Sequence, residues 1–298
     1  MSFPYMVSVR LMVYNHESYI REAIDSILKQ KINFLVEVVI GDDFSTDKSL
    51  EIIREYQDTA NINFKILDRK VGGEYWQNRQ KLGRLYNFIN IVENCTGKYI
   101  ALLDGDDYWT DSFKLQKQVN FLEDNQDYNL VGHHAVNSNQ EKIGNFDEDI
   151  FSFGDIYYRN LRIPTASLVF RNNLEIPDWF FKIYGGDRAL IYLNSIKGKI
   201  KILSFTGSFY RIHAFGIEQL YKKEKFKYPI RCINEEIIYY HLIKKLPKGI
   251  RIFKKILKYH FYILAYSFIK IRIDYFFKAL FSLLLFLTIK KVKIEYLP

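Results

Sequence analysis

Three features of the 298-residue chain predict an α/β fold with a mostly parallel central sheet flanked by helices. In the first third, short runs of apolar and β-branched residues alternate with segments whose apolar residues recur at helical spacing. Two of the strand-like runs end in adjacent aspartates. The composition, with 48% apolar and 26% charged residues, is that of a globular protein with room for one sizeable domain and an appendage.

The elements of the first third follow from two patterns. Strands are expected where a short β-branched run is bounded by glycine or polar residues, and helices where apolar residues recur every three or four positions. Helices of about ten residues between strands indicate βαβ units, and therefore parallel pairing. The strands predicted in this way span 7–14, 36–40, 64–67 and 99–103, and the helices span 15–30, 47–56 and 82–93.

The rest of the chain continues the pattern less regularly. A helix is predicted after Lys114, where Leu115, Val119 and Leu122 share one face. The segment 128–160 is ambiguous. The remaining predicted elements are a strand at 166–170, a helix from Gly185 through Leu193, a strand at 199–210 interrupted at Gly207, and helices in the C-terminal extension.

The most informative segment is an apolar run that ends in three carboxylates within four positions, Asp104, Asp106 and Asp107. Like charges this close repel one another unless a cation or several hydrogen-bond donors neutralise them. Hard divalent cations take oxygen ligands, commonly one or two carboxylates together with substrate phosphates. The segment therefore indicates a metal and diphosphate site, and the alternative is an acidic surface turn, because Asp-Gly is also common in turns.

A second acidic pair, Asp42 and Asp43, follows an earlier predicted strand. Successive parallel strands place their carboxyl ends on one edge of the sheet, which is where open α/β sheets bind ligands. We therefore expect the two acidic loops to converge.

Five segments together resemble the family 2 glycosyltransferases, which are inverting enzymes with a GT-A fold. The resemblance covers about residues 5–215 and has its parts in the family's order. The segments are Tyr14-Asn15-His-Glu17, Asp42-Asp43-Phe-Ser45-Thr46-Asp47, Asp104-Gly105-Asp106-Asp107-Tyr-Trp, Gly186-Asp187 and Tyr210-Arg211-Ile-His213.

The resemblance implies a binding site for a nucleotide-sugar donor. The first two loops would hold the base and ribose, and a nearby basic residue, Arg79, Lys81 or Arg84, would reach the diphosphate; we name Lys81. For Asp43, Ser45 and Asp47 the alternative is loop and helix capping. The nucleotide-sugar-binding residues implied by the resemblance are Tyr14, Asn15, Glu17, Asp42, Asp43, Lys81, Asp104, Gly105 and Asp106.

The resemblance also implies a metal ion. Asp104 and Asp106 match the family's DXD motif, in which Mn²⁺ or Mg²⁺ neutralises the departing diphosphate. His213 is the third candidate ligand, although a lone histidine is commonly structural. Trp109, beside the acidic cluster, is a candidate for stacking on a sugar.

Asp187 is the candidate catalytic base. Inverting transfer is one in-line displacement, so a carboxylate must take the proton of the acceptor hydroxyl as its oxygen attacks. The preceding Gly185 and Gly186 leave room for an acceptor and allow a sharp turn. From the residues alone, Asp187 is equally an ordinary helix N-cap.

The positive charge of the chain lies in its C-terminal part. Residues 248–298 contain 11 Lys or Arg and 2 acids, which accounts for the whole net charge of +9. This distribution does not favour nucleic acid as a partner, because a nucleic-acid patch lies on the folded reading domain. Two apolar runs flanked by basic residues, 259–269 and 279–289, instead favour contact with an anionic membrane surface, and the alternative is a helical bundle packed on the core.

We expect two domains, a GT-A domain at 1–225 and a basic, aromatic-rich helical extension at 226–298. Cys95 and Cys232 lack zinc spacing, no signal peptide is evident, and no run reaches the ~18 apolar residues that cross a bilayer, so a cytosolic setting is expected.

The sequence thus predicts a metal-dependent inverting hexosyl- or N-acetylhexosaminyltransferase. The resemblance implies transfer from a nucleotide-diphosphate sugar to a glycan or polyprenyl-linked acceptor. A UDP-sugar is the favoured donor. The expected setting is the inner face of a bacterial plasma membrane, in capsule, O-antigen or other surface polysaccharide synthesis. The rivals are a sugar-phosphate nucleotidyltransferase, which would need a glycine-rich basic loop after the first strand, a haloacid-dehalogenase-type phosphatase and a non-catalytic scaffold. The sequence leaves open whether the chain forms a homo-oligomer.

Overall fold

The structure is a computed structural model, and the residues described are 3–144, 150–151, 162–214, 216, 232, 235–239, 254, 256–258, 260–265 and 273–288. The chain forms two compact units. One consists of Met1–Ile176 with Asp187–Ile212, and the other of Pro177–Gly186 with His213–Pro298.

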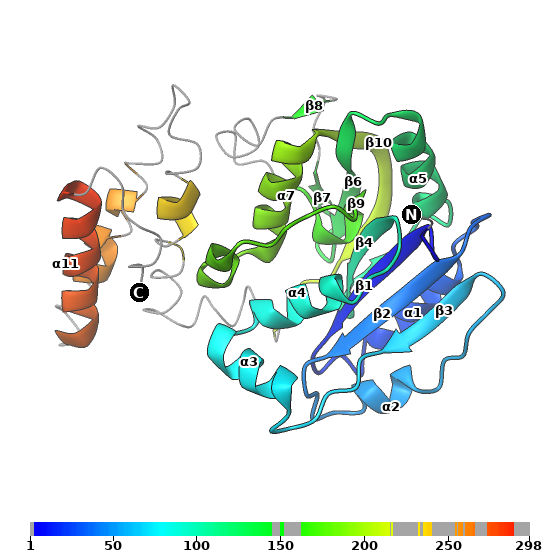
Figure 1. Cartoon of the computed structure of the whole chain (residues 1–298), viewed down its shortest axis with the longest axis horizontal. Helices are drawn as coiled ribbons and strands as arrows, with labels where there is room; N and C mark the ends of the chain where they lie inside the picture. The colour runs from blue at the N-terminus through cyan, green and yellow to red at the C-terminus, as the bar shows by residue number, and fades with distance from the viewer. Residues whose placement is uncertain are drawn as a thin grey trace. The chain divides into compact units, whose positions relative to one another are not determined.

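The first unit is built on one mixed sheet, which Figure 1 shows with helices around it. The strand order is β3-β2-β1-β4-β9-β6-β10-β5, in which β3, β2, β1 and β4 are parallel, as predicted. β9 runs antiparallel to both β4 and β6, so the second half of the sheet is mixed. The strands are β1 (Val7–Val13), β2 (Val36–Asp42), β3 (Ile62–Ile66), β4 (Tyr99–Asp104), β5 (Tyr108–Trp109), β6 (Tyr128–Asn137), β7 (Lys142–Ile143), β8 (Ile150–Phe151), β9 (Val169–Arg171) and β10 (Lys199–Tyr210).

The helices confirm the predicted alternation and differ from it in two places. The helix predicted at 82–93 is present as α4 (Leu85–Glu93). A further helix, α3 (Glu74–Leu82), was not predicted, and it ends at Gly83, whose φ is 82°. The strand predicted at 166–170 begins instead with the 3₁₀ turn η1 (Thr165–Ser167). The other helical elements are α1 (Ile20–Leu28), α2 (Ser49–Ile53), α3 (Glu74–Leu82), α4 (Leu85–Glu93), α5 (Lys114–Asp124), η2 (Asp178–Lys182), α7 (Gly186–Lys197) and α11 (Ile273–Thr288).

The core of the first unit lies between the sheet and its helices. Every residue of β2 is buried, as expected for a parallel strand covered on both faces, and α1 buries the apolar stripe that predicted it. One charged residue, Arg10, sits fully buried in the middle of β1.

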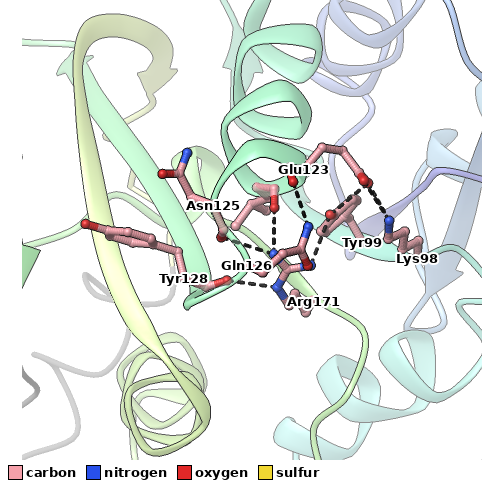
Figure 2. Close-up of polar contacts among 8 residues, drawn as sticks. Lys98, Tyr99, Glu123, Asn125, Gln126, Tyr128 and Arg171 are labelled. Carbon is pink, nitrogen blue, oxygen red and sulfur yellow. Dashed lines mark hydrogen bonds and ion pairs between the residues drawn. The ribbon is translucent and has the colours of Figure 1, made fainter.

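The amino end of β4 is fixed by a polar network that joins it to α5, β6 and β9 (Figure 2). Arg171 donates to the carbonyl oxygens of Leu122 at 2.6 Å and Tyr128 at 2.8 Å, and to the Tyr99 hydroxyl at 3.2 Å. Glu123 accepts hydrogen bonds from that hydroxyl at 2.9 Å and from Lys98 at 2.6 Å. This network therefore anchors the end of β4 that lies opposite to the acidic loop.

The second unit contains α11 and the shorter helical segments of the C-terminal part. Several large apolar side chains on these elements are exposed, including Phe261, Ile273, Phe277, Phe281 and Leu284. Within the described part of the chain, no helix is both long enough and apolar enough to pass through a bilayer.

Candidate functional site

The carboxyl ends of β1, β2 and β4 lie side by side, as the sequence predicts. Val13 is in register with Asp42, and Met12 with Asp104. The two acidic loops therefore start from neighbouring strands at one edge of the sheet.

The loop after β1 is joined to the loop after β2 by reciprocal hydrogen bonds. The side chain of Asn15 accepts a bond from the Thr46 N–H at 2.8 Å, and that of Glu17 accepts one from the Lys48 N–H at 3.0 Å. Asp47 in turn accepts the N–H of Glu17 at 3.0 Å. Asn15 also adopts a φ of 54°, a left-handed conformation that asparagine tolerates well. These hydrogen bonds give a structural role at this edge to Asn15, Glu17 and Asp47, in addition to any contact with a ligand.

Tyr14 and Asp42 lie at this edge in different environments. The Tyr14 side chain is 53% exposed, so its ring is available as a wall for a ligand. Asp42 is buried, and its two carboxylate oxygens accept the N–H of Ser45 at 3.0 Å and its hydroxyl at 2.5 Å. Each carboxylate oxygen has a second lone pair, so this turn leaves acceptor capacity for a ligand.

Asp43 is paired with Arg79, one of the three basic residues considered for contact with the diphosphate. The Arg79 guanidinium lies 2.8 Å from a carboxylate oxygen of Asp43, and the Tyr75 hydroxyl donates to the other oxygen at 2.8 Å. Burial raises the pKa of Tyr75, which keeps this hydroxyl protonated as a donor. Lys81, at the end of α3, is exposed. Its predicted contact with a diphosphate stays a prediction.

The three carboxylates after β4 have three different surroundings. Asp104 accepts a 2.6 Å bond from the buried Arg10, whose guanidinium lies 4.4 Å from the Phe88 ring centre. Asp107 is buried and accepts the N–H of Arg211 at 2.8 Å. Asp106 is partly exposed, with one oxygen 3.8 Å from the Nε2 atom of His16.

Burial raises the pKa of both Asp104 and Asp107, and the charge of Asp106 raises both further. Arg10 opposes the shift at Asp104. The raised pKa values mean that the anionic forms of Asp104 and Asp107 are disfavoured in this loop, and a bound cation would favour them. This donor chemistry, carboxylate oxygens under mutual repulsion, fits a hard divalent cation.

The protein ligands for such a cation are few. Among the described residues, no group of three or more His, Cys, Asp or Glu side chains is arranged to hold a metal ion. Asp104 and Asp106 alone correspond to the one or two carboxylates with which Mg²⁺-type sites operate when phosphates complete the shell. His213 belongs to the second compact unit, so its role as a third ligand stays a prediction.

Arg211 is a residue of this edge whose role the sequence reasoning missed. Its Nε atom donates to the carbonyl oxygen of Asp106 at 2.9 Å, its guanidinium pairs with Glu22 on α1, and it lies 4.7 Å from the Tyr19 ring centre. It thereby ties the acidic loop to α1. The only signal in the sequence was its place in the Tyr-Arg-Ile-His segment.

Asp187 is placed at the same edge. It lies in the first turn of α7, where the helix dipole favours a negative charge, and Thr165 donates to its carboxylate at 3.2 Å. Because β9 runs antiparallel to β4, with the Leu102 N–H bonded to the Leu168 carbonyl oxygen, the preceding turn η1 lies toward the carboxyl end of β4. The bond to Thr165 therefore places the carboxylate of Asp187 at the edge that carries Asp104.

The expected role of Trp109 in stacking on a sugar is wrong. The side chain is 4% exposed, and its indole N–H donates to the carbonyl oxygen of Ala166 at 2.9 Å. Lys114 covers the ring at 4.1 Å. Trp109 is a core residue beneath the acidic loop, because pairing of β5 with β10 turns it inward.

Comparison with known proteins gives a consistent picture. Residues 8–189 match the family model described as glycosyl transferase family 2. An uncharacterized protein of Mycobacterium tuberculosis is 33% identical over 218 residues, which are 71% of this chain and 60% of that protein. The minor teichoic acid biosynthesis protein GgaA of Bacillus subtilis is 26% identical over 57% of this chain and 40% of its own. The chain thus spans about three fifths of the length of the mycobacterial relative.

Two solved structures share the fold. S. aureus TarS in complex with UDP-GlcNAc aligns with a TM-score of 0.62 at 18% identity, over 86% of this chain and 72% of that one. A mannosyltransferase of Pyrobaculum calidifontis in complex with GDP-Man and Mn²⁺ aligns with a TM-score of 0.50 at 14% identity, over 99% and 78% of the two chains. These likenesses support the predicted GT-A fold.

Proposed function

The chain belongs to glycosyl transferase family 2, and from this premise we propose that it is a metal-dependent, inverting glycosyltransferase that uses a nucleotide-diphosphate sugar. One observation carries the proposal. The acidic loop of β4 and the carboxylate of Asp187 lie at the same sheet edge, which supports a role for the loop in holding the leaving group and for Asp187 as the base.

The donor we propose is a UDP-sugar, of the hexosyl or N-acetylhexosaminyl type. The UDP-GlcNAc complex of TarS, which has the same fold, supports this choice. Tyr14 would form one wall of the base site, and Asp42 would accept a hydrogen bond from a pyrimidine N–H. Asn15, Glu17 and Asp43 would keep these two loops in place through the bonds described above, beside any direct contact with the nucleotide.

Asp104, Gly105 and Asp106 would receive the diphosphate, and the two carboxylates would hold Mn²⁺ or Mg²⁺, with His213 as a further candidate ligand. The cation would stabilise the charge that develops on the leaving phosphate oxygen, as a Lewis acid does. Arg10 fixes Asp104 from beneath, while Arg211 fixes the carbonyl group of Asp106. The Mn²⁺ complex of the archaeal neighbour supports this use of a metal.

Asp187 would act as the base. As the acceptor oxygen forms its bond to the anomeric carbon, the bond from that carbon to the phosphate oxygen breaks, and the hydroxyl proton passes to the carboxylate of Asp187. A single displacement of this kind inverts the anomeric configuration. The bond from Thr165 orients the carboxylate before the acceptor arrives.

A thermal-shift panel tests the donor site. UDP, GDP, CMP and their common sugars are added to the wild type with Mn²⁺ or with EDTA, and we expect one nucleotide to raise the midpoint only with Mn²⁺. Asp106→Ala should lose this stabilisation, because a nucleotide stabilises the folded protein only if it binds to it. Asp127→Ala is the matched control, since that exposed aspartate pairs with Lys199 at the other end of the sheet. Stabilisation of Asp106→Ala equal to that of the wild type would refute the site.

The acceptor we propose is a glycan or a polyprenyl-linked glycan in bacterial surface polysaccharide synthesis, such as capsule or O-antigen. The teichoic acid protein among the relatives supports this class. We further propose that the chain works at the cytoplasmic face of the plasma membrane. The net charge of +9 in residues 248–298 suits anionic lipid, and α11 exposes Ile273, Phe277, Phe281 and Leu284 at helical spacing.

Vesicle co-sedimentation tests the membrane proposal. We expect the full chain to bind vesicles that contain phosphatidylglycerol and not purely zwitterionic ones, with weaker binding at high salt. Phe277→Glu with Phe281→Glu should release the protein, whereas Leu35→Glu, at an exposed leucine of the first unit, should not. Undiminished binding of the double variant would exclude α11 as the contact.

A further inference from the structure

The second compact unit contains the segment that leads into the candidate base. Pro177–Gly186 folds with the C-terminal part of the chain, and Asp187 is the next residue. The backbone just before the base is therefore fixed by whatever holds Tyr184, Gly185 and Gly186.

Glu235 holds this segment. One oxygen of its carboxylate accepts the N–H of Tyr184 at 3.1 Å and the N–H of Gly185 at 3.0 Å. The residue is 5% exposed and lies in the short helical segment 235–239. Burying a carboxylate costs free energy unless hydrogen-bond donors satisfy it. Here two successive backbone N–H groups donate to it.

The glycine pair explains why such a restraint matters. Glycine has more backbone freedom than any other residue, so Gly185 and Gly186 would leave the start of α7 loosely defined on their own. Glu235 fixes the backbone two residues before Asp187, and Thr165 holds the carboxylate itself. Small displacements of a reacting group lower the reaction rate strongly, because a misplacement of about 1 Å can reduce the rate about 100-fold.

We propose that Glu235 is a positioning residue for the base, acting through the Tyr184–Gly185 backbone. The inference rests on the proposed role of Asp187. Glu235 lies in the C-terminal part of the chain, far in sequence from the acidic loops. On this proposal it is required for turnover but not for donor binding.

The test measures nucleotide release from UDP-GlcNAc by the full chain in Mn²⁺, together with the affinity for UDP. Glu235→Ala should lower turnover about 10- to 100-fold with the affinity for UDP unchanged, because only the base is displaced. Glu235→Gln keeps an acceptor oxygen and should restore most of the rate. Glu235→Asp withdraws the oxygen by about 1.5 Å and should fall between the two, which provides a readout if the alanine variant fails to fold.

Glu37→Ala is the matched control. Glu37 is equally buried and accepts the Thr96 N–H and the Ser8 hydroxyl, but it lies at the amino end of β2, away from the acidic loops. Its loss should lower stability and leave the turnover of the folded enzyme unchanged.

The outcomes separate the two proposals. If Glu235→Ala, or Glu235→Asp in its place, turns over like the wild type, or loses rate only as Glu37→Ala does, the positioning role is refuted. If Asp187→Asn itself retains full turnover, the proposed function fails first and this inference fails with it. An inactive Asp187→Asn beside a fully active Glu235→Ala refutes the inference alone.

Discussion

Asp187→Asn is expected to lower the rate of sugar transfer by about 10²- to 10⁴-fold while the affinity for the donor stays unchanged. The substitution keeps the size of the side chain and an oxygen that can accept the bond from Thr165. It removes the capacity to take a proton from the acceptor hydroxyl. The loss should therefore appear in kcat, with little change in the KM for the donor.

Asp178→Asn is the matched control for this prediction. Asp178 also stands in the first turn of a short helical element, η2, and has no part in the proposed chemistry. Its substitution should leave kcat near the wild-type value. Equal activity of Asp187→Asn and wild type would make Asp187 a helix-capping residue and would favour a non-catalytic scaffold.

Arg10→Met is expected to destabilise the protein by about 3 kcal/mol, the lower end of the range for a broken buried pair, because the Asp104 side chain is 25% exposed. Arg10 is fully buried in β1 and is bonded to Asp104 at 2.6 Å, so its loss leaves the Asp104 carboxylate without its cation. A largely desolvated charge that loses its partner costs more free energy than the pair contributed. Methionine fills a similar volume, so the change isolates the charge from the packing.

Denaturant unfolding checks this prediction. Arg21→Met serves as the control, because Arg21 pairs with Glu55 on the surface and both side chains are more than half exposed. Exposed ion pairs contribute little, so this variant should unfold near the wild-type midpoint. Similar midpoints for the two variants would show that the Arg10–Asp104 pair is not a structural element of the site.

The part of the fold that carries the site could be predicted from the sequence, because it depends on local patterns. The buried parallel strands leave continuous apolar runs, and the acids that follow them must then share an edge. The antiparallel insertion of β9 could not be predicted, since nothing local to residues 166–170 states which strands they pair with.

The side-chain contacts of the site residues were harder to predict from the sequence. Arg79, and not the neighbouring Lys81, pairs with Asp43, a choice made by which face of α3 meets the loop. Trp109 stands beside the acidic cluster in the chain and yet points into the core, because β5 pairs with β10. Arg10 was a signal that the sequence analysis did not use, since an arginine inside an apolar strand implies an anionic partner, which is Asp104.

The most direct test of the proposed donor site is a crystal structure of the full chain with UDP and Mn²⁺, with the metal located by its anomalous signal. We expect a Mn²⁺ ion in coordination contact with the carboxylate of Asp106 and with the diphosphate. We also expect the uracil ring to lie beside Tyr14 and Asp42, with Asp187 facing the outer phosphate. A nucleotide bound away from the carboxyl ends of β1, β2 and β4, or a diphosphate bound there with no metal at Asp104 or Asp106, would contradict it.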